Sequence, residues 1–263
     1  MGYINNVTGY RDGLLSTRSI IRRGNFALLE PDGLVQNRLP GFEGCQATIL
    51  ASPKLGASFV DYLLTVQPGG GNREGFGTGE EEVFFTLLEG ELTVGNEDGS
   101  QDMRKGGYLY NPPGKHLFLE NKSGEAAKGF LYKRLYDRIE GHEPHAVAGN
   151  IDDVPFKDYE GMADVRVKDF LPAADDLAFD MNFHILSFRP GASHGYIETH
   201  FQEHGAYVYS GEGMYVLDDQ WLPVQKGDYL FMGAYCPQAC YAVGRDEEFA
   251  YIYSKDCNRD VRL

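Results

Sequence analysis

An internal repeat constrains this 263-residue chain more than any other feature. Residues 106–110 (GGYLY) match residues 227–231 (GDYLF) at an offset of 121 positions, and each run follows a lysine. Three further pairs of runs recur at nearly the same offset: 88–91 with 209–212, 67–70 with 189–192, and 130–133 with 250–253. Because this spacing equals the common size of a domain, we expect two copies of one fold.

Each copy has the pattern of short β-strands. Residues 61–66 and 181–188 are rich in strand-forming side chains, and each run is followed by a Pro-Gly turn. The 33 glycines and 13% aromatic residues favour many turns between short strands. The sequence therefore predicts an all-β chain of two sandwiches or closed barrels. It leaves room for few short helices, of which residues 14–23 are the best candidate.

The repeat also predicts the domain division. We expect a first domain over residues 1–150, which includes the start of a connector, and a second domain over residues 151–263. The connector, about residues 138–172, is acidic and mixed in composition. We expect it to wrap around the domains rather than to fold alone.

The charge balance limits the partners. A net charge of −15 makes the chain a poor candidate for binding nucleic acid or an anionic membrane. No apolar run approaches the ~18 residues of a membrane span, and the first residues lack the pattern of a signal peptide. The four cysteines form no disulfide framework for a chain of this size, so we expect a reduced, cytoplasmic protein. We expect Cys236 and Cys240 to be small buried residues, and residues 80–82 (EEE) to form a solvated loop.

The second copy carries a carboxylate and two imidazoles close together in sequence: Glu198, His200 and His204. On a strand, residues 198 and 200 share one face, with Cα atoms roughly 6.6 Å apart. A straight strand would place His204 about 13 Å beyond His200, too far to bind the same ion. Either the chain turns between the two histidines, for which Gly205 and the polar residues before it are suited, or His204 is no ligand.

These residues resemble the motifs of metal-binding cupins, which carry G(x)5HxH(x)3–4E(x)6G and then G(x)5PxG(x)2H. Residues 198–211 resemble the first motif with Glu and His exchanged, and residues 227–238 resemble the second, with Gln in place of its histidine. The resemblance implies the ligands Glu198, His200, His204 and Gln238. In the first copy the same positions hold Gly77, Gly79, Val83 and Leu117, and His116 misses the last one by one residue. We therefore expect a bicupin whose first barrel holds no metal.

The resemblance extends over the whole chain. Residues 1–11, 191–200 and 251–260 are similar to the bacterial (S)-ureidoglycine aminohydrolases, a bicupin family. That family implies one Mn²⁺ in the second barrel and hydrolytic release of ammonia from (S)-ureidoglycine, giving (S)-ureidoglycolate in allantoin and purine degradation. It also implies substrate contacts at Tyr215, Tyr251 and Lys255, together with the ligands Glu198 and Gln238.

The residue types agree with that chemistry. One carboxylate, two imidazoles and one amide, without a thiolate, suit Mn²⁺ or Fe²⁺ better than structural Zn²⁺ or copper. A single glutamate leaves a divalent ion with a net charge of +1, which favours an anionic substrate. Lys255 shares strand parity with Tyr251 and Tyr253, so it can face inward and pair with a carboxylate. We expect Glu198 and Lys255 to be the catalytic residues, with Glu198 moving a proton to the departing ammonia.

Two alternatives stay open at this point: a metal-dependent bicupin dioxygenase, and a non-catalytic cupin that binds a small acid. The sequence also leaves open whether the reaction passes through an imine or by direct displacement. His194 has the strand parity of the ligands and is expected beside them rather than among them. Exposed strand edges lead us to expect a homo-oligomer.

Overall fold

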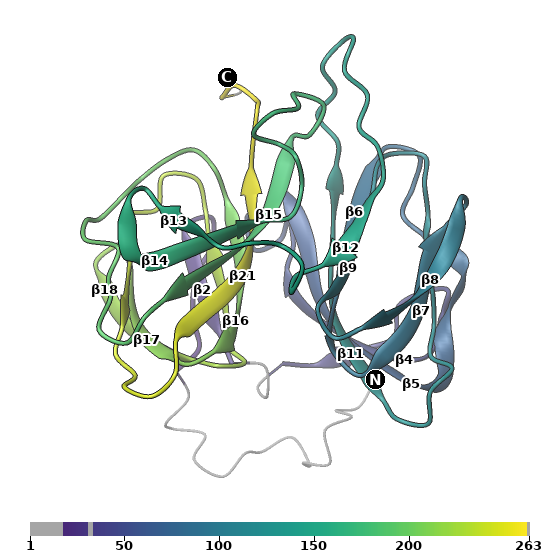
Figure 1. Ribbon diagram of the computed structural model, residues 1–263, viewed down its shortest axis with the longest axis horizontal. Coiled ribbons are helices and arrows are strands. Elements are labelled where there is room, and N and C mark those ends of the chain that lie inside the picture. Colours follow the sequence, from purple (N-terminus) through teal and green to yellow (C-terminus); the bar gives the residue numbers. More distant parts are fainter. Residues whose placement is uncertain (1–17, 31–33, 262–263) are drawn as a thin grey trace. The chain divides into compact units, whose positions relative to one another are not determined.

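The computed structural model describes residues 18–30 and 34–261, and every regular element in this part of the chain is a β-strand. The strands form two compact units (Figure 1). Unit 1 contains residues 35–52 and 58–153, and unit 2 contains residues 18–30, 34, 53–57 and 154–261. The all-β prediction is confirmed, since the described residues include no helix.

The candidate helix at residues 14–23 is wrong where the structure describes it. Residues 14–17 lie outside the described residues, and Ile20–Arg22 forms strand β1. Ile20 and Ile21 pair with Leu28 and Ala27 of the next strand. Two consecutive β-branched residues favour this extended pairing over a helix.

Unit 1 is one ten-stranded antiparallel sheet that folds over on itself. One part runs in the order β12 (Val147–Asn150), β9 (Gly107–Asn111), β6 (Glu81–Glu89), β11 (Ala127–Leu135), β5 (Phe59–Phe76), β4 (Phe42–Ala51) and β3 (Gln36–Asn37). The other part contains β10 (Leu117–Glu120), β7 (Glu91–Asn96) and β8 (Gly99–Arg104). The 18-residue strand β5 belongs to both parts, because it pairs with β11 and β4 along one stretch and with β10 along another. A Cβ atom at Gly71 would lie 2.2 Å from the Leu119 carbonyl oxygen, so this crossing requires glycine.

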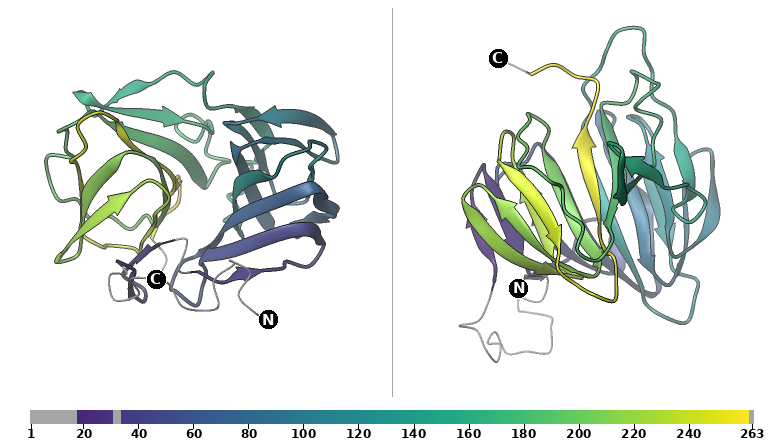
Figure 2. Two further views of the ribbon diagram at one scale, coloured as in Figure 1. Left: turned by 90° about the horizontal axis from the view of Figure 1, so that it is seen from below. Right: turned by 60° about the vertical axis from the view of Figure 1, so that its left-hand side comes forward.

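Unit 2 divides the same arrangement between two sheets (Figure 2). The eight-stranded sheet runs β1, β2 (Phe26–Leu29), β19 (Tyr229–Met232), β16 (His204–Ser210), β21 (Phe249–Asp256), β15 (Met181–Phe188), β14 (Met162–Asp169) and β13 (Lys157–Tyr159). The three-stranded sheet contains β18 (Gln220–Gln225), β17 (Glu212–Leu217) and β20 (Gln238–Ala242).

The two units repeat one strand order, as the sequence repeat predicts. In unit 1 the central order is β9-β6-β11-β5, with β10-β7-β8 as the second layer. In unit 2 the corresponding order is β19-β16-β21-β15, with β20-β17-β18 as the second layer. Residues 61–66 lie in β5 and residues 181–188 form β15, as expected. The connector has no sheet of its own, because β12 joins the sheet of unit 1 while β13 and β14 join that of unit 2.

The predicted first domain, residues 1–150, differs from the structure near the start of the chain. Strand β2 pairs with β19 over four positions, from Leu29 opposite Tyr229 to Phe26 opposite Met232. All four residues of β2 are buried, and β2 lies between β1 and β19, so that these two strands extend the sheet of unit 2 beyond β19. Residues 18–30 therefore belong to the unit that contains the second copy.

Each unit has its own apolar core. The core of unit 1 is aliphatic for the most part, with Leu64, Val83, Leu117 and Leu131 at most 1% exposed. The core of unit 2 includes Tyr215, Tyr251 and Tyr253 among its aliphatic residues. Burying each such apolar side chain contributes roughly 1.5–3 kcal/mol. No described helix is long and apolar enough to cross a membrane.

Two expectations about single residues have opposite outcomes. Cys236 and Cys240 are free and buried, as expected. Burial raises the pKa of Cys236 to about 11 and that of Cys240 well above its ordinary value, so both stay thiols. The solvated loop predicted at residues 80–82 is wrong for its last two residues, because strand β6 begins at Glu81. Glu82 lies in β6 with no exposed surface, where it accepts a hydrogen bond from the Tyr110 hydroxyl at 2.7 Å.

Candidate functional site

His204 opens strand β16 in the interior of unit 2 and is 4% exposed. Its Nδ1 lies 2.8 Å from the Ser254 carbonyl oxygen, which can only accept, so Nδ1 carries the proton and Nε2 presents a lone pair. Burial holds the pKa of His204 well below its ordinary value, and the neighbouring side chains of His200 and Lys255 lower it further. The imidazole is therefore neutral at pH 7 and is a potential metal ligand.

His200 is arranged in the same way. Its Nδ1 lies 3.1 Å from the Gln202 carbonyl oxygen, and its Nε2 lies 3.4 Å from Nε2 of His204. Burial lowers the pKa of His200 as well. Two neutral imidazoles thus turn their lone pairs toward one point, where no proton lies between them. Such an arrangement has little stabilisation of its own and suits a bound cation.

The bend expected before His204 is present. Residues 200–203 lie outside any strand, and the His200 carbonyl accepts a 2.7 Å hydrogen bond from the Tyr235 backbone N–H. This connection anchors His200 beside the loop before β20. The bend removes the separation of about 13 Å that a straight strand would impose between the two histidines.

Gln238 and Glu198 face the same point from neighbouring segments. Glu198 and Gln238 form an isolated β-bridge, with backbone hydrogen bonds of 3.0 and 2.9 Å. The side-chain nitrogen of Gln238 lies 3.0 Å from Nε2 of His200. A 180° turn of the amide exchanges its nitrogen for its oxygen without changing its shape, so Gln238 can offer an oxygen to a cation. The structure therefore brings all four predicted ligands together.

The Glu198 carboxylate is the most loosely placed of the four. Its Oε1 lies 3.9 Å from Nε2 of His200 and 3.6 Å from Nε2 of His194. Burial raises the pKa of this carboxyl, against the opposing effects of His200 and Lys255. In the described part of the chain, no three His, Cys, Asp or Glu side chains already meet at metal-binding geometry. Glu198 therefore has to rotate toward the two histidines to complete a four-ligand set.

The predicted substrate residues line a small cavity beside the ligands. Tyr215, Tyr251 and Lys255 contribute to its wall together with Tyr253, as strand parity predicts. The hydroxyls of Tyr215 and Tyr251 are 3.2 Å apart, and burial raises both pKa values well above 10, so both remain donors. About 10 Å³ is free for the centre of a water molecule, near the minimum for one water. A ligand larger than water therefore requires the side chains that line this cavity to move.

Tyr159 completes the wall and was missed by sequence reasoning. It lies at the end of β13, in the connector, and also packs against His194 with ring centroids 5.5 Å apart. Burial raises its pKa above its ordinary value. The signal in the sequence is a tyrosine directly before the turn at residues 160–161. That turn joins β13 to β14, and the two strands form a hairpin in the sheet of unit 2. The connector therefore contributes to the site, although it was expected only to wrap.

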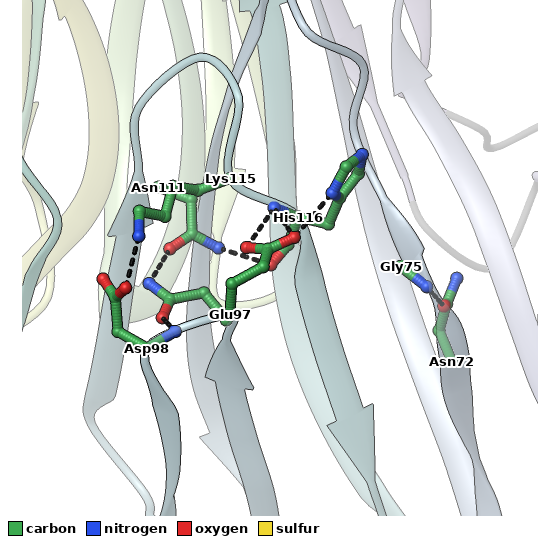
Figure 3. A network of polar contacts seen from close by, with 8 residues as sticks. Asn72, Gly75, Glu97, Asp98, Asn111, Lys115 and His116 are labelled. Carbon is green, nitrogen blue, oxygen red and sulfur yellow. Dashed lines mark hydrogen bonds and ion pairs between the residues drawn. The ribbon is translucent and has the colours of Figure 1, made fainter.

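The equivalent region of unit 1 has different contents (Figure 3). Val83 and Leu117 are buried in the core, in the places of His204 and Gln238. His116 instead points to Glu97, with Nδ1 2.7 Å from Oε1 and its backbone N–H also bonded to that carboxylate. Lys115 pairs with Asp98 beside it. The one-residue offset predicted for His116 thus turns it out of the barrel.

Comparisons with known proteins give the family of the chain. No family model matches the chain. The chain is 59% identical to the (S)-ureidoglycine aminohydrolase of Escherichia coli strain K12, over all 263 residues and the full length of both chains. The chain belongs to the (S)-ureidoglycine aminohydrolase family. It is therefore an enzyme of the hydrolase class. A plant member of the family, from Arabidopsis thaliana, is 30% identical over 93% of this chain and 79% of its own length.

Solved structures give the fold. The protein Ylba from E. coli matches with a TM-score of 0.86 and 54% identity, over 97% of this chain and 100% of that one. A putative glyoxylate-induced protein from Pseudomonas aeruginosa matches with a TM-score of 0.85 and 29% identity, over 96% and 95%. Bacillus subtilis oxalate decarboxylase shares only the fold, with a TM-score of 0.66 and 12% identity over 92% and 79%. The chain has two tandem cupin barrels, as predicted.

Proposed function

We propose that this chain hydrolyses (S)-ureidoglycine to (S)-ureidoglycolate and ammonia, with one Mn²⁺ in the second barrel. Water replaces the α-amino group, so the carbon–nitrogen bond breaks and a carbon–oxygen bond forms. The convergence of two imidazole lone pairs on one point, beside Glu198, Gln238 and Lys255, carries the proposal. The names of the E. coli and A. thaliana relatives support the substrate. The expected setting is allantoin degradation in the cytoplasm.

Glu198, His200, His204 and Gln238 would hold the ion. The fit rests on two observations: both Nδ1 atoms are bonded to backbone carbonyls, and the two Nε2 atoms face each other at 3.4 Å. With both Nδ1 atoms protonated, each Nε2 presents a lone pair. This donor set suits Mn²⁺. When bound, the ion supplies a Lewis acid that orients and polarises the reacting groups.

Lys255 and the tyrosines would bind the organic part of the substrate. Ureidoglycine carries a carboxylate, an α-amine and a ureido group. The half-buried Lys255 ammonium lies at the cavity wall and can pair with the carboxylate. The buried hydroxyls of Tyr215 and Tyr251 can donate to the ureido oxygen. These contacts would hold the α-carbon in one orientation next to Glu198.

Glu198 would move the proton. A carboxylate whose pKa is raised by burial is a stronger base than an exposed one, and its protonated form is more populated near neutral pH, so it can take a proton from the attacking water and deliver it to the departing nitrogen. Proton transfer to the departing nitrogen makes ammonia the leaving group. Lys255 and Glu198 would therefore act together, one binding the substrate and the other moving the proton.

Ammonia release from freshly prepared (S)-ureidoglycine tests the proposal. The protein is treated with a chelator and then assayed with and without Mn²⁺, and the enzyme-free rate is subtracted. We expect release well above that background with Mn²⁺ and near background without it. Oxygen uptake by the Fe²⁺-loaded protein, without ammonia release, would favour a dioxygenase instead. Bound metal without any turnover would favour a non-catalytic acid-binding cupin.

A further inference from the structure

Residues 192–198 run beside β20 with a local bulge. His194 donates its backbone N–H to Cys240 at 2.9 Å, and Glu198 forms its bridge with Gln238. The partners Cys240 and Gln238 are two residues apart on β20, whereas His194 and Glu198 are four residues apart. Three residues, 195–197, thus stand opposite the single residue 239, and they form the bulge, where Gly195 adopts a φ of +76° and Ile197 is 56% exposed.

The bulge brings two side chains together that a regular strand would separate by about 13 Å. Nε2 of His194 lies 3.6 Å from Oε1 of Glu198. Bulges near active sites commonly re-aim a side chain in this way. The bulge thus adds a third imidazole next to the most loosely placed of the four predicted ligands.

His194 is buried and its Nε2 has no hydrogen-bond partner in the described structure. The ring packs between Tyr159 and Tyr196, with centroid separations of 5.5 and 5.0 Å, and against the edge of Phe188. Leaving a buried polar atom unpaired destabilises a fold. A small rotation of the Glu198 carboxylate about its soft terminal torsion closes the 3.6 Å gap to hydrogen-bond distance.

We propose that His194 is a positioning residue for Glu198. Its Nε2–H donates to the Glu198 carboxylate whenever that carboxylate is turned away from His200. This bond holds the carboxylate in the orientation from which it exchanges a proton with the departing nitrogen. The inference rests on the proposed function and adds to it a residue that contacts neither the ion nor the substrate.

Four variants separate positioning from packing. His194→Phe keeps the ring stack and removes the donor. His194→Gln loses the ring but places an amide N–H near the position of Nε2, whereas His194→Asn places one near Nδ1. Tyr196→Phe keeps the ring that packs on His194 and serves as the matched control. Each variant is assayed for kcat, KM, Mn²⁺ bound per chain and thermal unfolding.

Loss of an outer-sphere partner of this kind lowers activity about 10–100-fold. We expect that loss in kcat for His194→Phe and His194→Asn, with KM and bound Mn²⁺ changed less than about threefold. We expect His194→Gln to recover kcat to within about threefold of the wild type, and Tyr196→Phe to stay there. Because Gln and Asn both remove the ring, their comparison decides the question even if His194→Phe does not fold.

Three results would overturn the inference: wild-type kcat in His194→Phe, equal kcat in His194→Gln and His194→Asn, or loss of Mn²⁺ from the His194 variants. The last result would make His194 part of metal binding. An inactive, Mn²⁺-loaded wild type would instead overturn the proposed function, so the two failures are distinguishable.

Discussion

The two barrels are built on one strand order but differ in how one strand ends. In unit 1, β5 runs unbroken for 18 residues and crosses from one layer to the other. In unit 2, β15 has only eight residues, and the chain after it bulges along β20 before it reaches His200. After β15 the chain leaves the eight-stranded sheet and carries Glu198 and His200 outside any strand longer than one bridge, whereas β5 stays paired with neighbours in both layers. The site therefore arises from an interruption of the fold.

The barrels also differ in the side chains that fill their interiors. Val83 and Leu117 pack into the core of unit 1, where unit 2 has His204 and Gln238. An apolar filling stabilises a barrel by removing surface from water. Buried polar groups do so only when each is bonded. We infer that unit 1 serves stability and unit 2 serves chemistry, and substitutions in one unit should leave the other property unchanged.

The largest expected effect is the loss of activity when a predicted metal ligand of unit 2 is replaced. His200→Ala should abolish Mn²⁺ binding and lower kcat/KM more than about 1000-fold, because several kcal/mol of charge stabilisation are lost. His116→Ala, the matched change in unit 1, should leave both quantities unchanged. Metal analysis and ammonia release check this prediction. A metal-free His200→Ala protein with wild-type activity would contradict the site.

The next effect is on stability through unit 1. Leu117 has no exposed surface, so Leu117→Ala should lower the free energy of unfolding by about 2–5 kcal/mol. Chemical denaturation measures it. We expect KM and kcat for the folded fraction to stay within twofold of the wild type. A metal-free or inactive but folded Leu117→Ala protein would show that unit 1 also serves the chemistry.

A third comparison uses one lysine from each barrel. Lys133 forms an ion pair with Glu81 at 2.8 Å, and Lys255 lines the cavity of unit 2. Lys255→Ala should raise KM about 10–100-fold, since a hydrogen bond between charged groups contributes about 1.5–3 kcal/mol. Lys133→Ala should not change KM. Steady-state kinetics over a range of substrate concentrations distinguish them, and equal effects would remove Lys255 from the substrate site.

The smallest effect is a pH dependence confined to unit 2. Burial lowers the pKa of His204 below its unfolded value of about 6.5, so the unfolded chain binds more protons in that range. The contribution of His204 to the stability of the metal-free protein is thus retained above pH 6.5 and lost as pH falls toward the folded pKa. Between pH 8 and pH 5, the melting temperature of the wild type should therefore fall relative to that of His204→Phe. A constant difference would contradict the buried neutral imidazole.

The repeated fold and the grouping of the candidate ligands were predictable from the sequence, because both depend on the spacing of residues along the chain. The repeat predicts the shared strand order, and the interval between residues 200 and 204 requires a bend if both histidines bind one ion. Long-range pairing was not predictable: nothing local to residues 26–29 indicates that they pair with β19. The burial of Glu82 depends on Tyr110, 28 positions along the chain, and is likewise invisible to a local pattern. The role of the bulge at residues 195–197 depends on the register against β20, which only the structure provides.

The most direct test of the difference between the barrels is the number of manganese ions per chain. Chelator-treated protein is reloaded with Mn²⁺, desalted and analysed for metal and protein, in parallel with His204→Ala and His116→Ala. The account predicts one ion per chain in the wild type and in His116→Ala, and none in His204→Ala. Two ions per chain in the wild type, or one retained in His204→Ala, would contradict it.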